Sequence, residues 1–252
     1  MSQRGFSQGD AIAQSEGLIK FFHSGKKLEF KKNNIILRAR EEPQGVYFVE
    51  KGFVKVFTVS REQNEHNHIF YSSSNIFPII WAFHGAIRNV SYRAMSPATI
   101  YVVSKDEFMD FIKSDNEACL QLLYYSTNLF KQYAARIDNL LYSNSYDKIA
   151  YRLLTLLDQF GELKGKKLTI KAPITQLDIG NSISLSREMT SRVISRMQKR
   201  GVINYDSQHN FVIKDLAPLF HVIGNEVVEG MWPELYKIAI TLQPNLVGQV
   251  GR

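Results

Sequence analysis

The stretch that decides the fold of this chain is residues 173–205, PITQLDIGNSISLSREMTSRVISRMQKRGVINY. Thr175 is placed to cap a first short helix, because its side-chain oxygen can accept a hydrogen bond from a backbone N–H of the first turn. Ser186 can cap a second helix in the same way, and Gly201 stands just past the end of that helix. Residues 183–185 leave room for only a tight turn between the two. The stretch therefore predicts a helix-turn-helix.

The predicted second helix, residues 186–200, has two chemically different faces. Its apolar residues recur at helical spacing on one side: Met189, Val193, Ile194 and Met197. Its polar residues fall on the other side: Arg187, Glu188, Ser191, Arg192 and Ser195. A helix that packs through one face and presents hydrogen-bonding groups on the other is suited to the major groove of DNA. The alternative is an ordinary helix pair in a core, whose arginines are merely solvated.

The residues around this helix pair add a hairpin and positive charge. Two short apolar runs, 202–205 and 211–213, flank five polar residues, which is typical of a hairpin and hence of a winged helix-turn-helix. The whole chain has 31 Lys and Arg against 24 Asp and Glu, and residues 144–216 hold twelve against seven. Lys166 and Lys167 lie in a predicted basic loop, residues 164–167, before the helix pair. This excess favours binding to phosphates, whose neutralisation releases counterions.

The N-terminal part of the chain has short apolar runs separated by turns. Five of these runs are expected to be strands: 34–37, 46–49, 54–59, 68–71 and 100–103. No segment between these predicted strands shows helical periodicity. Strands at this spacing predict a small antiparallel β-barrel or jelly roll.

A long helix is predicted over residues 116–142, after a short helix at 105–115. One set of its residues follows the spacing 4-3-4-3-4: Leu123, Thr127, Phe130, Ala134, Ile137 and Leu141. This spacing is typical of a coiled-coil seam, so we expect the helix to form a homodimer. A second apolar stripe, made of Leu122, Leu129 and Leu140, would let the helix pack on its own barrel as well. The two interpretations are compatible.

Length and composition favour a cytoplasmic protein of about two domains. No apolar run approaches the roughly 18–20 residues that a membrane span needs. The N-terminus lacks the charged-then-apolar pattern of a signal peptide. The single cysteine, Cys119, excludes an intramolecular disulfide and an all-cysteine iron–sulfur site within one chain.

Two motifs resemble the CRP/FNR family of bacterial transcription regulators. They are Ile-Thr-Gln-x-Asp-Ile-Gly at 174–180 and Ser-Arg-Glu-x-x-Ser-Arg at 186–192, of which the second is the more specific. Residues 140–154 are also similar to the family. More loosely, residues 46–57 resemble the strand-turn-strand of cyclic-nucleotide-binding barrels.

This resemblance implies an α+β fold with three main parts. They are an N-terminal antiparallel β-barrel (a jelly roll like that of cyclic-nucleotide-binding proteins), a long dimerisation helix and a C-terminal winged helix-turn-helix. We place the sensor barrel at 1–115, the dimerisation helix at 116–143, the DNA-binding domain at 144–216 and a helical extension at 217–252. The implied protein is a homodimeric regulator and not an enzyme. Its implied partners are double-stranded DNA, a second copy of itself, RNA polymerase and an unknown small-molecule effector.

The motifs also imply which residues contact DNA. The expected contacts are Thr175, Gln176, Ser186, Arg187, Glu188, Ser191 and Arg192, with Lys166 and Lys167 on phosphate. Arg-Glu-x-x-x-Arg resembles the readers of TGTGA-like half-sites, and Glu-x-x-Ser-Arg resembles the readers of TTGAT-like half-sites. This helix contains both patterns. We therefore expect a near-palindromic site with a guanine-containing half-site near TGTGA or TTGTGA.

The effector pocket departs from the family pattern. Cyclic-nucleotide binders have a Gly-Glu pair, an Arg-Ser pair and a polar pair on the long helix. The six matching positions hold Pro78, Ile79, Arg88, Asn89, Tyr133 and Ala134. Losing the glutamate removes a charge-assisted hydrogen bond of roughly 1.5–3 kcal/mol, so we do not expect cyclic AMP. Arg88 is either the partner of another anion or a structural arginine, and the apolar run 76–83 either lines a pocket or fills the barrel.

Histidines in the barrel region are the candidate ligands for a cofactor. Haem would need a histidine ligand, and His84 lies in the appropriate loop but stands alone. In a competing interpretation the barrel is a cupin-like enzyme, because His66 and His68 form a His-x-His pair. Position 72 is a serine, however, and no Glu follows before Asp106. A third interpretation is a DNA-binding protein whose barrel is only a partner-interaction module.

Overall fold

The computed structural model describes residues 16–142 and 144–246, which divide into two compact units. The first unit holds the described residues up to Tyr133, and the second holds those from Ala134 onward. Helix α4, Asn116–Leu141, contributes residues to both. Residue 143, the end of the predicted dimerisation segment, lies outside the described residues. The predicted four-part division of the chain stays a prediction.

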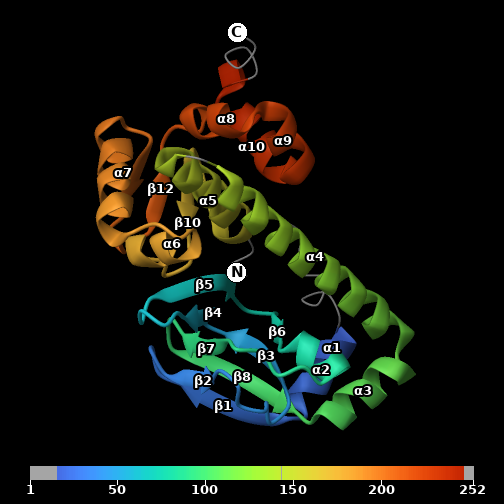
Figure 1. Cartoon of the computed structure of the whole chain (residues 1–252). Coiled ribbons are helices and arrows are strands. Elements are labelled where there is room, and N and C mark those ends of the chain that lie inside the picture. The colour runs from blue at the N-terminus through green and yellow to red at the C-terminus, as the bar shows by residue number, and fades with distance from the viewer. Residues whose placement is uncertain (1–15, 143, 247–252) are drawn as a thin grey trace. The chain divides into compact units, whose positions relative to one another are not determined.

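The first unit is built on two antiparallel four-stranded sheets (Figure 1). Their orders are β1-β8-β3-β6 and β2-β7-β4-β5. The strands are β1 Lys26–Phe30, β2 Ile35–Leu37, β3 Val46–Lys51, β4 Val54–Val59, β5 Glu65–Tyr71, β6 Ile76–Phe77, β7 Ser91–Ala94 and β8 Ala98–Val103. The predicted jelly-roll architecture is confirmed, although the two sheets do not close into a single barrel.

Aromatic side chains fill the space between the two sheets. Phe77 lies at the centre, with ring centroids 5.3 Å from Tyr47, 5.6 Å from Tyr71 and 4.6 Å from Tyr92. All four side chains are buried, and they come from four different strands. Burying such large rings removes about 150–250 Å² each from water and dominates the energetics of a core of this size.

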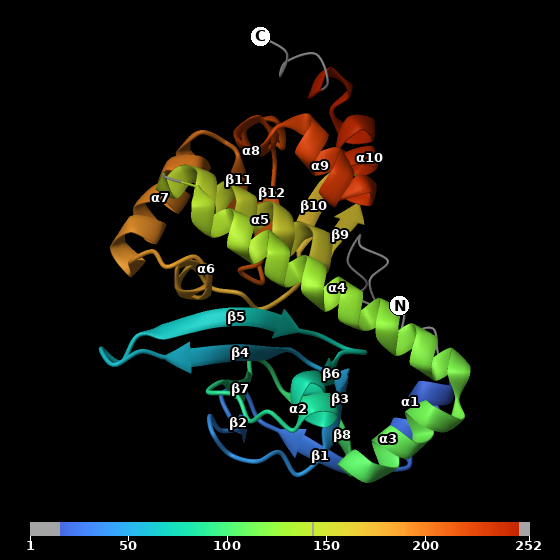
Figure 2. The same ribbon diagram turned by 45° about the vertical axis from the view of Figure 1, so that its right-hand side comes forward.

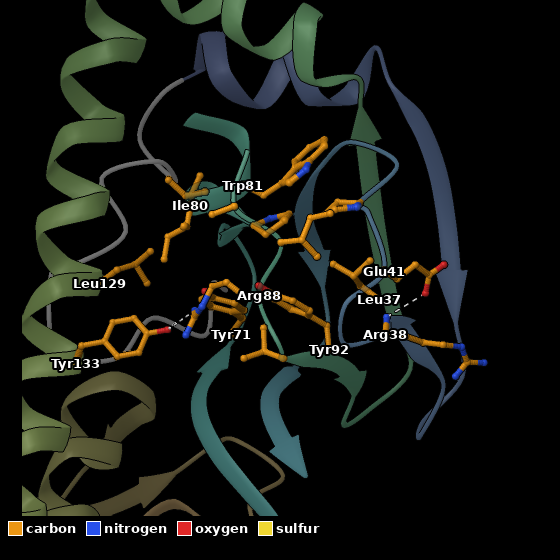
Figure 3. A pocket seen from close by; sticks show the side chains of 16 residues that line it. Leu37, Arg38, Glu41, Tyr71, Ile80, Trp81, Arg88, Tyr92, Leu129 and Tyr133 are labelled. Carbon is orange, nitrogen blue, oxygen red and sulfur yellow. Dashed lines mark hydrogen bonds between the residues drawn. The ribbon is translucent and has the colours of Figure 1, made fainter. Parts of the chain in front are cut away.

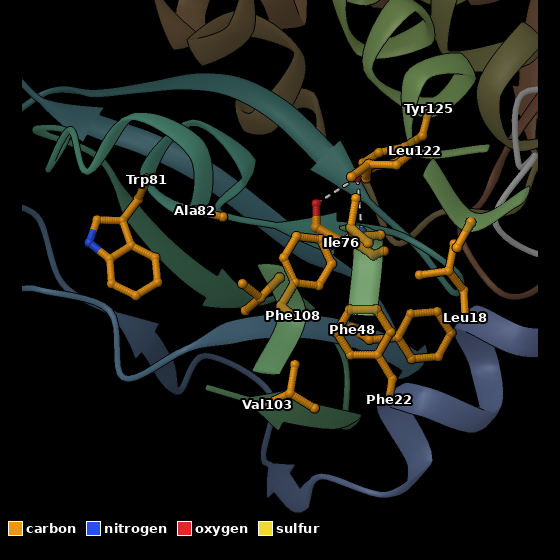
Figure 4. Close-up of a cluster of buried hydrophobic side chains, with 13 residues drawn as sticks. Leu18, Phe22, Phe48, Ile76, Trp81, Ala82, Val103, Phe108, Leu122 and Tyr125 are labelled. Atoms are coloured by element: carbon orange, nitrogen blue, oxygen red, sulfur yellow. Dashed lines mark hydrogen bonds between the residues drawn. The ribbon is translucent and has the colours of Figure 1, made fainter. Parts of the chain in front are cut away.

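Three helices and the beginning of α4 form a second core at the edge of this sandwich. The helices are α1 Glu16–His23, α2 Ile79–His84 and α3 Lys105–Ser114. Phe22, Phe48 and Phe108 pack together there (Figure 4). The buried Tyr125 hydroxyl of α4 donates to the carbonyl of Ile76 at 2.7 Å and accepts from its N–H at 2.9 Å. This pair of bonds satisfies the N–H and carbonyl of Ile76 in β6, a strand of only two residues that also pairs with β3.

The second unit has the predicted winged helix-turn-helix. Its helices are α5 Ser145–Phe160, α6 Gln176–Ser182 and α7 Arg187–Lys199, and its strands are β9 Gly161–Lys164, β10 Lys167–Ile170, β11 Ile203–Tyr205 and β12 Phe211–Ile213. The sheet order is β11-β12-β10-β9. The interpretation of residues 164–167 as a loop was wrong, because Lys164 and Lys167 pair across the β9–β10 hairpin and only two residues form its turn.

The C-terminal extension is helical and packs on α5. It contains α8 Ala217–Ile223, α9 Asn225–Met231, α10 Pro233–Leu242 and a short 3₁₀ turn at Pro244–Leu246. Helical structure was predicted at 216–228 and 234–242, with Gly230 and Pro233 between. A break is present directly before Pro233, at Trp232, while Gly230 itself lies inside α9. An additional break lies at Gly224, whose positive φ of 88° suits a residue without a side chain.

Among the described residues, no helix combines the length and the apolar character required to cross a membrane.

Candidate nucleic-acid interface and effector pocket

The first helix of the pair begins with the predicted cap. The Thr175 hydroxyl accepts from the backbone N–H of Asp178 at 3.1 Å, and the Asp178 carboxylate accepts from the backbone N–H of Thr175 at 3.1 Å. This reciprocal arrangement satisfies two N–H groups that a helix start otherwise leaves without partners. Ser186 caps α7 by accepting from the N–H of Met189 at 3.2 Å, also as predicted.

The turn between α6 and α7 is held by a close approach at Gly180. Its carbonyl accepts from the N–H groups of Ile183 at 3.1 Å and Leu185 at 3.0 Å. A Cβ atom at Gly180 would lie 2.6 Å from the Thr190 hydroxyl oxygen, so only glycine fits without displacement. Thr190 is fully buried and donates to the Ser186 carbonyl at 2.8 Å. Sequence analysis did not assign Thr190 to either face of the helix.

Helix α7 presents its polar residues to solvent. Val193, Ile194 and Met197 are buried as predicted. The exposed residues are Arg187, Glu188, Ser191, Arg192 and Ser195. The pKa of Glu188 is lowered because its carboxylate accepts hydrogen bonds from its own N–H and from the Ser186 hydroxyl. At neutral pH this row therefore offers guanidinium donors on either side of one carboxylate acceptor.

The wing is fixed to α6 by a contact that sequence analysis missed. The Gln176 side-chain amide donates to the Tyr205 hydroxyl at 2.9 Å, and the Tyr205 ring packs 4.8 Å from that of Phe211. In the wing turn, the Asp206 carboxylate accepts from the N–H groups of Gln208 and Asn210, both at 2.9 Å. Gln176 was expected to contact DNA, and here it also braces the wing.

Lys166 and Lys167 are exposed at the tip of the β9–β10 hairpin. In the strand order, β9 lies at the edge of the sheet opposite to β11 of the wing. Figure 2 shows α7 and β9 on opposite sides of this unit. Their phosphate contacts stay a prediction.

The predicted seam on α4 is an unpartnered apolar row. Leu123 is 59%, Phe130 75%, Ile137 62% and Leu141 79% exposed. Thr127 is exposed and Ala134 is partly buried. Of the second stripe, Leu122 is buried and Leu129 packs against the core, but Leu140 is exposed, so the stripe ends before it. Helix α4 thus buries one stripe within its own chain and leaves the 4-3-4-3-4 row open.

A pocket in the first unit contains four of the six predicted effector residues. Pro78, Ile79, Arg88 and Tyr133 line it (Figure 3). Arg88 donates from Nη1 to the Tyr133 hydroxyl at 3.3 Å. Two assignments differ from the structure. Asn89 accepts a hydrogen bond from Arg40 at 3.2 Å instead of lining the pocket, and Ala134 falls in the second unit, outside the lining.

Two family models match the chain, and together they account for more than half of it. Residues 27–115 match the cyclic nucleotide-binding domain, and residues 147–221 match the Crp-like helix-turn-helix domain. The chain belongs to the CRP/FNR family of transcription regulators. Regulators of the CRP/FNR family bind DNA through the helix-turn-helix, carry an effector-binding domain and dimerise.

Individual CRP/FNR proteins are distant from this chain in sequence but similar in fold. The anaerobic regulatory protein of Aggregatibacter actinomycetemcomitans is 22% identical over 203 residues, which is 79% of this chain and 77% of that protein. The cAMP-activated global transcriptional regulator CRP of Pasteurella multocida is 22% identical over 177 residues, covering 70% and 84%. The solved structure of a CooA mutant from Carboxydothermus hydrogenoformans has a TM-score of 0.69 at 18% identity, covering 82% of this chain and 92% of that one.

The pocket of this CRP/FNR protein combines charged and apolar lining residues. The charged residues are Arg38, Glu41 and Arg88, and the apolar residues include Leu37, Val90 and Leu129. Burial raises the pKa of Tyr71 well above its usual value and also raises that of Tyr92, so both hydroxyls are neutral. Burial acts to lower the pKa of Arg88, but the hydrogen bond to Tyr133 acts against it, and the net pKa is raised. The guanidinium is therefore charged.

The pocket has little free space as it stands. The space open to the centre of a water-sized sphere is about 50 Å³, which suffices for only a few waters. The apolar run 76–83 serves both of its predicted purposes: Ile76 and Phe77 fill the core, while Ile80 and Trp81 line the pocket. A ligand would have to displace side chains on entering.

Other candidate groups in the CRP/FNR barrel have ordinary partners. The His68 imidazole is hydrogen-bonded to the Thr58 hydroxyl at 3.1 Å. Among residues 16–142 and 144–246, no group of three or more His, Cys, Asp or Glu side chains is arranged to hold a metal ion. The pair His66 and His68 therefore lacks a third ligand of these types there. Cys119 is exposed on α4.

Proposed function

We propose that this CRP/FNR protein is a homodimeric, sequence-specific transcription regulator that binds a near-palindromic site through α7. The observation that carries the proposal is the exposed polar row Arg187, Glu188, Ser191 and Arg192 on a helix whose other face is buried. Its partners are double-stranded DNA, a second copy of the chain and RNA polymerase. A small effector other than cyclic AMP controls it through the first unit.

The chemistry of this row indicates a guanine-containing half-site. Arg187 and Arg192 can each donate a bidentate fork to guanine O6 and N7, and the ionised Glu188 can accept from cytosine N4. Ser191 is short enough to contact a neighbouring base edge. Two copies related by a two-fold axis would place these rows about one helical turn apart on DNA, so the half-sites should be inverted repeats near TGTGA or TTGTGA.

Selection from random DNA with the purified protein should enrich such a motif. Arg192→Ala should lose roughly 1–3 kcal/mol at its guanine and relax the preference at that position, because one bidentate pair disappears. The measurement is the sequence motif that each protein enriches. Binding titrations of the most enriched site and its single-base variants then give the affinities.

Lys166→Ala provides the contrast for this experiment. If Lys166 contacts phosphate, the variant binds all sequences more weakly to the same extent, and the slope of affinity against salt becomes shallower. A motif without guanine, or one that Arg192→Ala leaves unchanged, would contradict base readout by α7.

The pocket of the first unit supports an effector that is a small organic anion with an apolar body. Arg88 has five N–H donors, one of which is used on Tyr133. The rest of the lining includes apolar residues such as Leu37, Val90 and Leu129, together with Arg38 and Glu41. A carboxylate would satisfy the guanidinium as a bidentate partner, and an apolar body would occupy the walls. Ile79, at the position matched to the ribose-binding glutamate of cyclic-nucleotide binders, cannot accept a hydrogen bond from a sugar hydroxyl.

Calorimetry with cyclic AMP should therefore show no binding at micromolar concentration. Benzoate and octanoate should raise the thermal midpoint, whereas neutral benzamide should not, because only the acids engage the guanidinium. Arg88→Gln should weaken binding of the acids about tenfold or more. Arg40→Gln is the matched control, since Arg40 is exposed and pairs with Asn89 outside the pocket lining. Micromolar affinity for cyclic AMP, or acid binding that survives Arg88→Gln, would refute this assignment.

A further inference from the structure

Helices α9 and α10 lie beyond residue 221, where the match to the Crp-like helix-turn-helix domain ends. They are held firmly against the DNA-binding unit. Trp232, between them, is only 1% exposed, and its ring lies edge-on to that of Tyr151 in α5 at 5.2 Å. The Tyr151 hydroxyl donates to the Met231 sulfur at 3.4 Å. The C-terminal extension is therefore packed against α5 of this unit.

Helix α9 and the last turn of α4 line an open groove. Its lining residues are Asp138, Leu141, Tyr142, Tyr151, Val227 and Met231. The space in it open to the centre of a water-sized sphere is about 320 Å³, much more than in the pocket beside Arg88. On its two walls Leu141 is 79% and Val227 42% exposed. A concave surface with apolar walls can receive apolar side chains of another molecule.

Leu141 belongs to the groove and also to the apolar row of α4. In a dimer through this row the two copies are related by a two-fold axis, so Ile137 and Leu141 of one copy meet the same residues of the other. The end of the partner's α4 then lies at the mouth of the groove. The groove is therefore continuous with the proposed dimer seam.

The seam by itself offers limited area. Its four large apolar residues, at 59–79% exposure, present on the order of 500 Å² if each has the area of a large side chain. A stable interface buries roughly 800 Å² per partner. Exposed apolar residues elsewhere on α4, such as Leu120 and Tyr124, can supply part of the remainder. The groove is a further open apolar surface, and it adjoins the C-terminal end of the seam.

We infer that the groove between α4 and α9 receives the C-terminal end of α4 from a second copy, so that the C-terminal extension is part of the dimer interface. This inference rests on the proposed dimer seam of α4. It gives residues 217–246 a role that neither the barrel nor the helix-turn-helix requires, and it joins the dimer contact directly to the DNA-binding unit, because α9 and α5 meet at the contact between Met231 and Tyr151.

The first test is the dimer dissociation constant of Val227→Glu, measured by sedimentation equilibrium of the full chain. The constant should rise at least tenfold, because a carboxylate would be desolvated in an apolar groove. Val59→Glu is the matched control, since Val59 is also a valine, is 46% exposed and lies on β4. It should leave the constant unchanged. Both residues are exposed, so both variants should fold. An unchanged constant for Val227→Glu overturns the inference.

The second test identifies the occupant of the groove. In a Cys119→Ser background, a benzophenone attached to Val227→Cys is irradiated in mixtures with isotope-labelled copies. The expected product joins residue 227 of one copy to residues 137–142 of the other. A product with residues 247–252 of the same chain would make that segment the occupant, and the absence of any intermolecular product would likewise overturn the proposal.

The seam variant Phe130→Glu with Ile137→Glu distinguishes a failure of the groove contact from a failure of the proposed dimer seam. If that variant is monomeric while Val227→Glu dimerises like the unmodified protein, the groove inference fails and the proposed seam stands. If both variants keep the dimer, the seam itself is wrong and the inference fails with it. If both weaken the dimer and the cross-link forms between copies, both hold.

Discussion

Replacing Phe130 and Ile137 together by glutamate will convert the dimer to monomers and abolish specific DNA binding. Both side chains are exposed in the isolated chain, at 75% and 62%, and each would meet its own symmetry mate in the seam. The double variant therefore brings four carboxylates into an apolar contact, where they are both desolvated and mutually repelled. The dissociation constant should rise at least 10³-fold, which corresponds to about 4 kcal/mol.

Sedimentation equilibrium measures the loss of the dimer, and titration of the selected DNA site measures its consequence. A monomer keeps one recognition helix and loses the second half-site, so binding should fall toward the non-specific level, typically about 10³-fold weaker or more. Val59→Glu combined with Leu163→Glu is the control, because it exchanges two exposed apolar residues that belong to β4 and β9 and not to the row on α4. A seam variant that sediments as an unchanged dimer would rule out this row as the interface.

The apolar row could be predicted because it is a pattern within one helix. Spacing alone identifies Phe130 and Ile137, and in the described part of the chain their side chains are 75% and 62% exposed. The caps at Thr175 and Ser186 were predictable for the same reason, since each depends on a side chain and an N–H three residues away. Features that depend only on residues within one helix or one helical turn can therefore be predicted from a short segment of sequence.

Elements that depend on distant partners were missed. Strand β1, KKLEF, has no fully buried residue and is held by its pairing with β8, from Lys26 opposite Val102 to Phe30 opposite Ala98. Strand β6 is two residues long and depends on the Tyr125 hydroxyl. A short strand at 168–170 was predicted and corresponds to β10, but β9 was missed, because the charged residues of this hairpin mask the alternation expected of strands. Contacts with distant residues stabilise these strands, and the composition of the strands themselves does not indicate this.

The candidate functional residues also divide into those predictable from local sequence and those that depend on distant partners. The exposed row of α7 follows from helical period, whereas the hydrogen bond between Arg88 and Tyr133 joins residues 45 positions apart. Asn89 and Ala134 were assigned to the pocket by aligned position alone. Asn89 directly follows the pocket residue Arg88, but its side chain accepts a hydrogen bond from Arg40 instead of lining the pocket. The contact of Gln176 with Tyr205 likewise could not be read from either segment separately.

Gly180→Val should disrupt the helix-turn-helix and destabilise the DNA-binding unit by at least about 3 kcal/mol. A Cβ atom there would lie 2.6 Å from the Thr190 hydroxyl oxygen and 3.0 Å from the Leu185 carbonyl oxygen. Neither neighbour can move easily. Thr190 is stiff, fully buried and hydrogen-bonded to Ser186, and the Leu185 carbonyl is backbone. The gain of up to about 1 kcal/mol from removing a helical glycine is too small to offset this overlap. Hydrogen exchange at α6 and α7, together with thermal unfolding, measures the effect.

Gly230→Val is the matched control, because Gly230 also lies in a helix, and a Cβ atom there would meet nothing within 4 Å. It should change stability by less than about 1 kcal/mol. Adding Thr190→Ala to Gly180→Val should restore part of the loss, since it removes the nearest clashing atom, and this coupling distinguishes a specific overlap from general disruption. Equal stability of the two valine variants would mean that the approach of α6 to α7 at Gly180 does not determine the geometry of the recognition helix.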